Sequence, residues 1–468
     1  MKKFLIFSLV LSVGIYLIVN NILGTKSSAN LKNKFTKTQK IAIKKNLFPY
    51  KYITELEDKI VQQKSNFYYH HILLKELAFK KSLENIIFYK TKSIPLSNNN
   101  LELSKYKNLE GFHAGIWVWE PGSGYLEFYN KNLFVLSSRG ILGYGKIGKK
   151  EISLKQIKHN LNDFINEKHF MKKPWFSIKD LHIHNNKIFV SFTDEIKEDC
   201  WNTSLVFSEL NYQELNFKKL FTSEKCIHSK KNNEKVLIEK GLDGEFNAHQ
   251  SGGRILSLND DEIFFSTGGY RSRHTAQDIN SINGKILKIN ILTGSYKIIA
   301  MGLRNPQGLL YDKKNNFLLE TEHGPKGGDE INLIHLDKKK IQNYGWAIAS
   351  YGKHVGGNTS ERNENNYKKY PLLKSHKDNG FIEPLKYFVP SIGISQIVRI
   401  GEKSYISASM RDKSIYTFNL DNENQIQNFK RIEIGERVRD MIYKENNLIL
   451  FLESTASIGI IDLNNFSN

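Results

Sequence analysis

The amino-acid sequence predicts an all-β fold, a six-bladed β-propeller, across residues 111–468. From about residue 111 onwards, short alternating strands are separated by turns rich in Asn, Asp, Gly and Lys. One largely apolar strand recurs six times, and we interpret each copy as the inner strand of a four-stranded blade. A β-sandwich is the alternative, but it would not naturally repeat one strand type six times. The copies span residues 132–137, 187–192, 262–267, 316–321, 404–409 and 447–452.

Residues 1–24 have the composition of a membrane segment. Residues 4–19 carry no charge and follow Lys2 and Lys3, and the whole run approaches the length of about 20 residues that spans a bilayer. We expect an uncleaved signal anchor or transmembrane helix, with a secretory signal cleaved near residues 27–29 as the alternative. The propeller would then be membrane-anchored in the periplasm or another extracytoplasmic space. Lysines between residues 26 and 40 oppose this orientation, but large domains translocate largely regardless of flanking charge.

Residues 25–110 are predicted to form a basic, partly helical stalk. The formal net charge of the 468-residue chain is +20, and the first 110 residues contribute 19 lysines against 7 acidic residues. Residues 54–57 (TELE) have the form of a capping box, and apolar residues then recur at helical spacing. The rest of the chain has no Lys/Arg stripe interleaved with aromatic residues. We therefore expect no nucleic-acid partner and a solvated stalk near an anionic membrane surface.

The chain has two cysteines, Cys200 and Cys226, at the open ends of what reads as a β-hairpin. Their Cβ atoms could lie close enough to form a bridge. An even pair in an exported protein favours a disulfide, and two unrelated reduced cysteines are the alternative.

Polar residues and glycines lie directly beside the repeated strands. His249 precedes the third copy, where a neutral imidazole could act as a base, although a lone histidine is more often a hydrogen-bonded surface residue. Arg304 and Asn305 precede the fourth copy, and their side chains suit an anionic or carbonyl-rich ligand or a salt-bridged turn. Gly324 and Pro325 follow the fourth copy in a tight turn whose carbonyls could face a Ca²⁺ ion together.

Three arginines have the same placement. Arg411 follows the fifth copy, whereas Arg437 and Arg439 precede the sixth. Strand alternation puts Arg437 and Arg439 on one face, and two adjacent cations imply an anionic partner or exposure to solvent. Because all these residues flank repeated strands, a propeller would bring them together at one axial mouth.

Four segments between residues 303 and 346 carry the most specific motifs in the chain. They are LRNPQGL at 303–309, EHGP at 322–325, DEIN at 329–332 and NYGW at 343–346. With these motifs the chain resembles the glucose/sorbosone dehydrogenase family, the soluble aldose sugar dehydrogenases that use pyrroloquinoline quinone. The resemblance is clear over residues 241–463 and extends to residues 111–240 only in strand pattern.

The resemblance implies a six-bladed propeller that oxidises an aldose sugar at its anomeric carbon by hydride transfer to pyrroloquinoline quinone. The electrons would then pass to a respiratory acceptor. By motif, His249 matches the base that removes the sugar hydroxyl proton. Arg304 matches the arginine that polarises the quinone carbonyl and touches substrate, and Asn305 matches a cofactor contact.

The remaining matched residues concern the cofactor and calcium. Arg411 matches a cofactor-binding lysine, and the pair Arg437 and Arg439 matches arginines that neutralise the cofactor carboxylates. The backbone oxygens of Gly324 and Pro325 match ligands of the Ca²⁺ ion that bridges to the quinone. Two further residues, Glu330 and Tyr344, match the ligands of a second, structural Ca²⁺ ion in the family.

The chain departs from the family pattern near the base. Gly269 stands where the family usually has the carboxylate that orients the histidine, and Ala248 replaces a polar residue. Residues 173–177 (KPWFS) occupy the region of an early Gln-Gly-Gly-type cofactor segment. Loss of an orienting carboxylate weakens a histidine base strongly without abolishing binding. The alternative hypothesis is therefore a catalytically inactive propeller that binds a carbohydrate or a protein partner.

Overall fold

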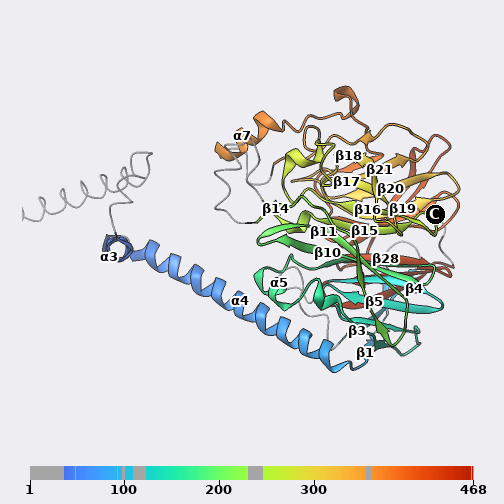
Figure 1. Ribbon diagram of the computed structural model, residues 1–468, viewed down its shortest axis with the longest axis horizontal. Helices are drawn as coiled ribbons and strands as arrows, with labels where there is room; N and C mark the ends of the chain where they lie inside the picture. Colours follow the sequence, from blue (N-terminus) through green and yellow to red (C-terminus); the bar gives the residue numbers. More distant parts are fainter. Residues whose placement is uncertain are drawn as a thin grey trace, which may run out of the picture. The chain divides into compact units, whose positions relative to one another are not determined.

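The computed structural model describes residues 36–47, 49–91, 93–96, 101–108, 123–229, 246–354, 361–464 and 466 (Figure 1). Residues 1–24, where the membrane segment is predicted, lie outside this set. No helix within the described ranges combines the length and the apolar character needed to cross a membrane.

The chain divides into two compact units, residues 1–69 and 70–468. The first unit contains helix α3 (Lys37–Leu47) and most of helix α4 (Pro49–Ser82), so part of the predicted stalk is helical. The last turns of α4 belong to the second unit, where Leu73 and Leu77 are buried. Gln156 donates hydrogen bonds to the carbonyls of Phe79 and Glu84 at this end of the helix.

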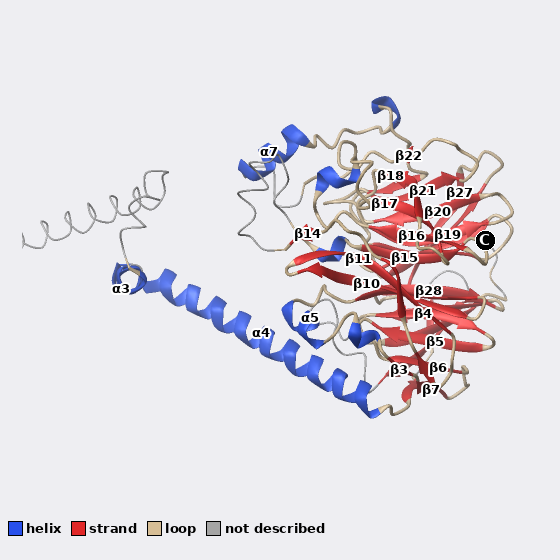
Figure 2. Ribbon diagram, viewed as in Figure 1, coloured by secondary structure: helices blue, strands red, loops and turns tan. Residues whose placement is uncertain are grey.

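The second unit is all-β and propeller-like, and strands dominate it (Figure 2). Within the described residues its strands form six four-stranded antiparallel groups. In order, the first strands of the groups are β4 (Gly124–Tyr129), β9 (Ile178–His184), β15 (Gly252–Ser257), β19 (Pro306–Asp312), β24 (Ile394–Arg399) and β28 (Val438–Lys444). The second strands are β5 (Asn132–Ser137), β10 (Lys187–Lys197), β16 (Glu262–Thr267), β20 (Phe317–Glu322), β25 (Ser404–Ser409) and β29 (Asn447–Leu452).

The third and fourth strands of each group lie farther from the ring of first strands. The third strands are β6 (Leu142–Gly145), β11 (Cys200–Glu209), β17 (Lys285–Asn290), β21 (Asp329–His335), β26 (Ser414–Leu420) and β30 (Ser457–Asp462). The fourth strands are β7 (Glu151–Gln156), β13 (Lys218–Phe221), β18 (Tyr296–Met301), β23 (Lys386–Phe388), β27 (Ile426–Glu433) and β3 (Leu101–Asn108). Shorter elements flank these sheets: β1 (Ile86–Lys90), β2 (Ile94–Leu96), β8 (Lys158–His159), α5 (Glu167–Lys172), β12 (Glu214–Leu215), β14 (Ile227–His228), β22 (Gln342–Asn343) and α7 (Glu361–Lys369).

The first strands of the six groups form a closed ring. Each contacts the first strand of the next group, and β28 contacts β4. The six repeated segments of the sequence are the second strands, each of which lies between two strands of its own group, so the prediction that they are inner strands of four-stranded sheets is confirmed. A second strand has a partner on both edges, and its apolar side chains meet the neighbouring sheets on both faces. This burial explains why that strand carries the strongest apolar signal.

The β unit begins earlier than the predicted boundary at residue 111. Strands β1 and β3 fall inside the predicted stalk, yet β1 pairs with β7 and β3 pairs with β30. Strand β3 supplies the fourth strand of the last group, which joins the N-terminal part of the unit to its C-terminal strands. The stalk prediction therefore extends too far by the length of these strands. The partner of β3 lies some 350 residues away, so the pairing leaves no local sequence signal.

Apolar side chains between adjacent sheets hold the ring together. Between the fourth and fifth groups, Phe317, Leu319 and Ile331 share a cluster with Ile394 and Phe418, and all five are buried. Burial of one such side chain stabilises the fold by about 1.5–3 kcal/mol. These clusters form the scaffold on which the loops at the strand ends are positioned.

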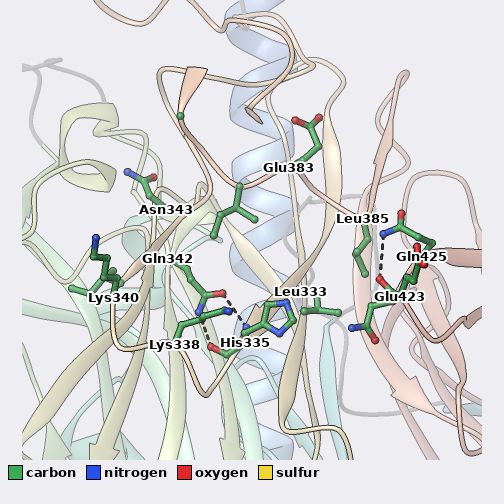
Figure 3. A pocket seen from close by; sticks show the side chains of 14 residues that line it. Leu333, His335, Lys338, Lys340, Gln342, Asn343, Glu383, Leu385, Glu423 and Gln425 are labelled. Carbon is green, nitrogen blue, oxygen red and sulfur yellow. Dashed lines mark hydrogen bonds between the residues drawn. The ribbon is translucent and has the colours of Figure 1, made fainter. Parts of the chain in front are cut away.

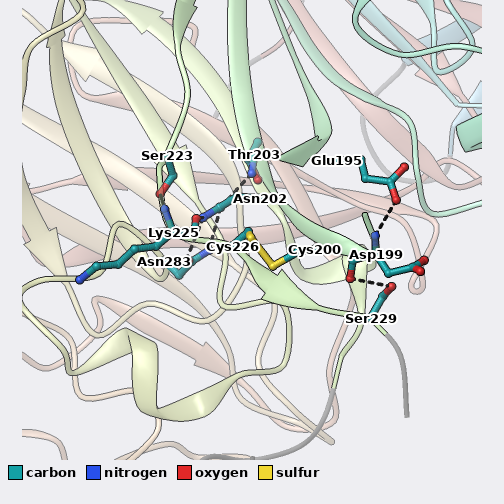
Figure 4. Close-up of a disulfide and its surroundings, with 10 residues drawn as sticks. All are labelled: Glu195, Asp199, Cys200, Asn202, Thr203, Ser223, Lys225, Cys226, Ser229 and Asn283. Carbon is teal, nitrogen blue, oxygen red and sulfur yellow. Dashed lines mark hydrogen bonds between the residues drawn. A yellow bond between two sulfur atoms is a disulfide. The ribbon is translucent and has the colours of Figure 1, made fainter. Parts of the chain in front are cut away.

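The disulfide prediction is confirmed. Cys200 at the start of β11 is bonded to Cys226, and their Cα atoms are 5.3 Å apart (Figure 4). Strand β14 follows directly and pairs with the start of β11. Beside the bridge, Asn202 donates to the carbonyl of Lys225 and exchanges amide hydrogen bonds with Asn283. The bridge fixes the outer edge of the second group.

Candidate active site

A cavity of about 300 Å³ lies at the ends of the strands where the sequence motifs converge. Residues that precede the first strand of a group, or follow its second strand, line this cavity. It brings together eight of the ten predicted site residues: His249, Arg304, Asn305, Gly324, Pro325, Arg411, Arg437 and Arg439. The prediction that these residues share one mouth is confirmed, while their chemical roles stay predictions.

His249 lies in a short 3₁₀ turn (Ala248–Gln250) just before β15. The Asn247 side chain caps this turn by accepting a hydrogen bond from the His249 backbone N–H at 2.8 Å. The indole ring of Trp175 meets the His249 ring edge-to-face, with centroids 5.1 Å apart. Burial, reinforced by Lys179 and Arg439, lowers the pKa of His249 to about 3. The imidazole is therefore neutral at physiological pH, which is the form a general base needs.

Arg304 is a buried cation at the opening of β19. Its guanidinium donates to the carbonyl of His323 at 2.7 Å and lies over the ring of Trp346, 5.4 Å from the centroid. Burial lowers the pKa of Arg304 to about 10, while Glu322 acts in the opposite direction. The guanidinium thus remains charged at neutral pH and is held from two sides.

Asn305 and Glu322 tie the loop before β19 to the end of β20. The Glu322 carboxylate accepts hydrogen bonds from the backbone N–H groups of both Arg304 and Asn305. The Asn305 side-chain oxygen accepts from the Gly252 N–H at 3.2 Å, which links the loop to the segment that carries His249. Burial raises the pKa of Glu322 to about 7.

Gly324 and Pro325 form a compact turn after β20. A Cβ atom on Gly324 would overlap the carbonyl oxygen of Gly328, so only glycine fits there. Asp329 closes the turn, because its carboxylate accepts from the N–H groups of Gly324 at 3.0 Å and Gly393 at 2.6 Å. The carbonyl oxygen of Pro325 accepts only a long hydrogen bond, 3.3 Å, from the Ser391 hydroxyl.

The arginine pair has a partner that sequence reasoning missed. Glu453, which follows β29, accepts from Arg437 Nε at 2.8 Å and from Arg439 Nη2 at 2.7 Å. Burial alone would raise the pKa of Glu453, but Arg439, Arg437 and the Ser123 hydroxyl lower it to about 2. The sequence predicts an anionic partner for the pair or exposure to solvent, and Glu453 already balances one of its two charges within the protein. Arg411 forms no side-chain hydrogen bond or ion pair with any described residue, and its side chain is exposed.

Glu330 and Tyr344 do not line the cavity. Glu330 lies in a buried acidic cluster with Glu320 and Asn332. Burial, together with Glu322, raises the pKa of Glu320 and Glu330 well above their usual range. The Glu320 Oε1 and Asn332 Oδ1 atoms are buried without a hydrogen-bond partner.

Tyr344 is buried near this cluster, and its hydroxyl donates to the carbonyl of Leu333 at 2.6 Å. This bond uses the phenol hydrogen, so both the phenol oxygen and the backbone carbonyl of Tyr344 keep lone pairs that could bind a metal. Across the described ranges, no three His, Cys, Asp or Glu side chains are grouped in a metal-binding arrangement.

Two further residues near His249 were missed by sequence reasoning. Lys179 on β9 lines a small cavity of about 30 Å³ with His249, Arg254 and Arg439. Burial, with Arg439 and Arg139 acting in the same direction, lowers the pKa of Lys179 to about 7. Trp175 falls within residues 173–177, which depart from the cofactor segment of the family. That departure is the sequence feature that could have drawn attention to Trp175.

A larger cavity of about 550 Å³ lies elsewhere, and Figure 3 shows its lining. Its wall includes His335 and Gln342, which exchange two hydrogen bonds, together with Glu383 and Glu423. None of the ten predicted site residues lines it, so volume alone does not identify the site.

The sequence model of the glucose/sorbosone dehydrogenase family matches residues 178–461. The chain belongs to this family. It is 27% identical over 212 residues to an aldose sugar dehydrogenase of Escherichia coli K12, a match that covers 41% of this chain and 53% of the relative. It is 29% identical over 208 residues to quinoprotein glucose dehydrogenase B of Acinetobacter calcoaceticus, covering 34% of this chain and 42% of the relative. The chain spans about half the length of the curated relatives it matches.

Solved structures of family members share the fold. The soluble aldose sugar dehydrogenase of Escherichia coli in its apo form has a TM-score of 0.55 at 18% identity, covering 73% of this chain and 95% of that structure. The aldose sugar dehydrogenase of Streptomyces coelicolor bound to pyrroloquinoline quinone has a TM-score of 0.53 at 16% identity, covering 81% and 98%. At these identities the likeness shows the fold alone.

Proposed function

We propose that the protein is a quinoprotein aldose sugar dehydrogenase built on a six-bladed β-propeller. The observation that carries this proposal is the convergence of His249, Arg304 and three further arginines on one cavity. Six four-stranded groups around a closed ring of first strands support the six-bladed interpretation. Family membership supports the class of chemistry.

The charge of the cavity fits an anionic cofactor such as pyrroloquinoline quinone. Arg437 and Arg439 with Glu453 leave one net positive charge, and Arg411 adds a second that has no partner among the described residues. Arginine also offers planar donor pairs that match carboxylates. We therefore assign cofactor binding to these arginines, together with Arg304 and Asn305.

The site also fits calcium at both predicted positions. The turn at Gly324 and Pro325 is closed too tightly for a side chain, so it can present its backbone oxygens to a hard cation. The buried cluster of Glu320, Glu330 and Asn332 contains two oxygen atoms without hydrogen-bond partners. A cation there would satisfy these oxygens and relieve the repulsion between the carboxylates.

In the proposed reaction, His249 accepts the proton of the anomeric hydroxyl of the aldose. The Asn247 cap holds the His249 backbone and the ring of Trp175 contacts its neutral imidazole, and such a base contributes about 10²–10⁴-fold to a rate. Pyrroloquinoline quinone supplies the hydride acceptor when it is bound. Arg304 remains charged, and its guanidinium is held against Trp346, so it can donate to an oxygen of the bound ligand. Electrons would leave to a respiratory acceptor at the membrane face where the predicted anchor places the protein.

Reconstitution of the purified full-length chain with quinone and Ca²⁺ tests this function. We expect quinone uptake, seen by its absorbance, and reduction of an electron-accepting dye that depends on an added aldose. His249→Ala should retain the uptake and lose the dye reduction. Failure of the wild-type chain to take up quinone would refute the enzyme proposal, and uptake without oxidation of any aldose would favour a binding function.

A further inference from the structure

Three consecutive carbonyl oxygens next to the active site accept hydrogen bonds from two basic side chains. Arg139 donates to Pro174 O at 3.0 Å and to Phe176 O at 3.2 Å, and Lys179 Nζ donates to Trp175 O at 2.9 Å. Arg139 is almost fully buried, whereas Lys179 is partly buried. Burial of the Arg139 cation is costly unless it is hydrogen-bonded, so its two bonds to one short segment are strong interactions.

The same segment is also fixed through its rings. Phe176 stacks on the buried ring of Trp201 with centroids 3.5 Å apart and planes at 11°. The neighbouring indole of Trp175 meets the Phe176 ring edge-to-face, with centroids 6.4 Å apart, and it meets the His249 imidazole in the same way at 5.1 Å.

This restraint coincides with a departure from the family pattern. Gly269 stands where relatives are expected to have a carboxylate that orients the base. A Cβ at Gly269 would have only the carbonyls of Arg304 and Ser272 near it, at 3.6 and 3.8 Å. A histidine base needs a fixed ring orientation, because misplacement by about 1 Å can cost roughly 10²-fold in rate. Trp175 is the ring that contacts the imidazole from another side.

We propose that Trp175, held in place by Arg139 and Lys179, is the residue that positions the His249 imidazole in this chain, in place of the carboxylate absent at Gly269. This inference rests on the proposed function, in which His249 is the base. Trp175 acts through His249 and takes no part in the transfer itself. The arrangement also sets the protonation state of the base, because it packs the imidazole among cations where a carboxylate would favour the charged ring.

The charged groups around His249 come from several elements. Lys179 on β9 and Arg439 on β28 oppose its protonation, as does His323 after β20, and Glu453 after β29 favours it. Burial is the largest contribution to the lowered pKa of His249. Removal of the Trp175 ring would admit water to the imidazole and would therefore raise this pKa towards 6.5.

The test compares Trp175→Ala with Trp175→Phe, and Tyr296→Ala serves as a control at an exposed aromatic residue of β18. In the quinone-loaded, full-length protein we expect kcat to fall roughly 10- to 100-fold in Trp175→Ala with KM and quinone uptake unchanged. Trp175→Phe should recover most of the activity, since a ring remains against the imidazole. The control should behave as wild type.

A second readout does not depend on activity. Nuclear magnetic resonance of the imidazole, assigned by comparison with His249→Ala, should show His249 neutral down to pH 4 in the wild type. The same ring should titrate nearer to pH 6.5 in Trp175→Ala. Unchanged kcat together with an unchanged titration in Trp175→Ala would overturn the positioning role. A wild-type chain that neither takes up quinone nor oxidises an aldose would refute the proposed function, and the titration would still decide the role of Trp175.

Discussion

Replacement of Glu453 by Gln tests the ion-pair arrangement beneath the cavity. Glu453 is fully buried and binds Arg437 and Arg439 at 2.7–3.0 Å. Its pKa is about 2, against 4.5 for an ordinary glutamate. At about 1.36 kcal/mol per pKa unit, this difference corresponds to roughly 3 kcal/mol of stability.

The direction of the pH dependence follows from the lowered pKa. The ionised carboxylate contributes its full stability above pH 4.5, and this contribution is lost as the pH falls from 4.5 to 2. The Glu453→Gln variant carries no ionisable group there. We expect it to be about 3 kcal/mol less stable than the wild type at pH 7, with a difference that shrinks towards zero near pH 2.

Urea unfolding followed by tryptophan fluorescence at pH 7, 5, 4 and 3 measures this difference. Glu402→Gln is the matched control, because Glu402 pairs with Lys314 in full contact with solvent and exposed ion pairs contribute little. A Glu453→Gln variant with the wild-type stability at pH 7, or with a difference independent of pH, would refute the assignment of Glu453 as the buried counter-ion of the arginine pair.

Three further changes have definite expected outcomes. Gly324→Ala should abolish Ca²⁺-dependent quinone uptake, because the new Cβ would overlap the Gly328 carbonyl and open the turn. Absorbance measures this uptake, and normal uptake would contradict the tight turn. The double variant Cys200→Ser/Cys226→Ser should lose about 3.5 kcal/mol of unfolding free energy, as expected when a bridge closes a loop across 26 residues. Denaturant titrations measure this loss, and an unchanged unfolding free energy would contradict a stabilising bridge. Arg411→Ala should weaken quinone binding about 10- to 100-fold in absorbance titrations with no loss of stability. Arg411→Lys should bind quinone nearly as the wild type does. Equal quinone binding by the wild type and both variants would exclude a role for this cation.

The overall architecture could be predicted because its signal is local and repeated. Each second strand carries its apolar pattern within six residues, so the number of four-stranded groups was readable without tertiary information. The placement of site residues beside those strands was equally local, and it predicted the shared cavity. The order of strands within a sheet was not, because first and second strands are both apolar and only their pairing distinguishes them.

Interactions between distant segments could not be read from the sequence. The pairing of β3 with β30 joins segments some 350 residues apart. Glu453 lies only 14 residues beyond Arg439, but the pairing of β28 with β29 had to be known before the two could be matched. Glu453 does occupy a recognisable position directly after the repeated segment 447–452, as Glu322 does after the segment 316–321. Trp175 and Lys179 reach His249 from a different sheet, where no motif marked them.

The rate of quinone reduction in a single turnover tests the central claim most directly. The quinone-loaded protein is mixed with an aldose that carries either hydrogen or deuterium at its anomeric carbon, and the quinone absorbance is followed. If His249 removes the hydroxyl proton while the anomeric C–H bond breaks, the deuterated sugar should react several-fold more slowly, and His249→Ala should show almost no reduction. Equal rates for the two sugars, or wild-type reduction in His249→Ala, would contradict the proposed reaction.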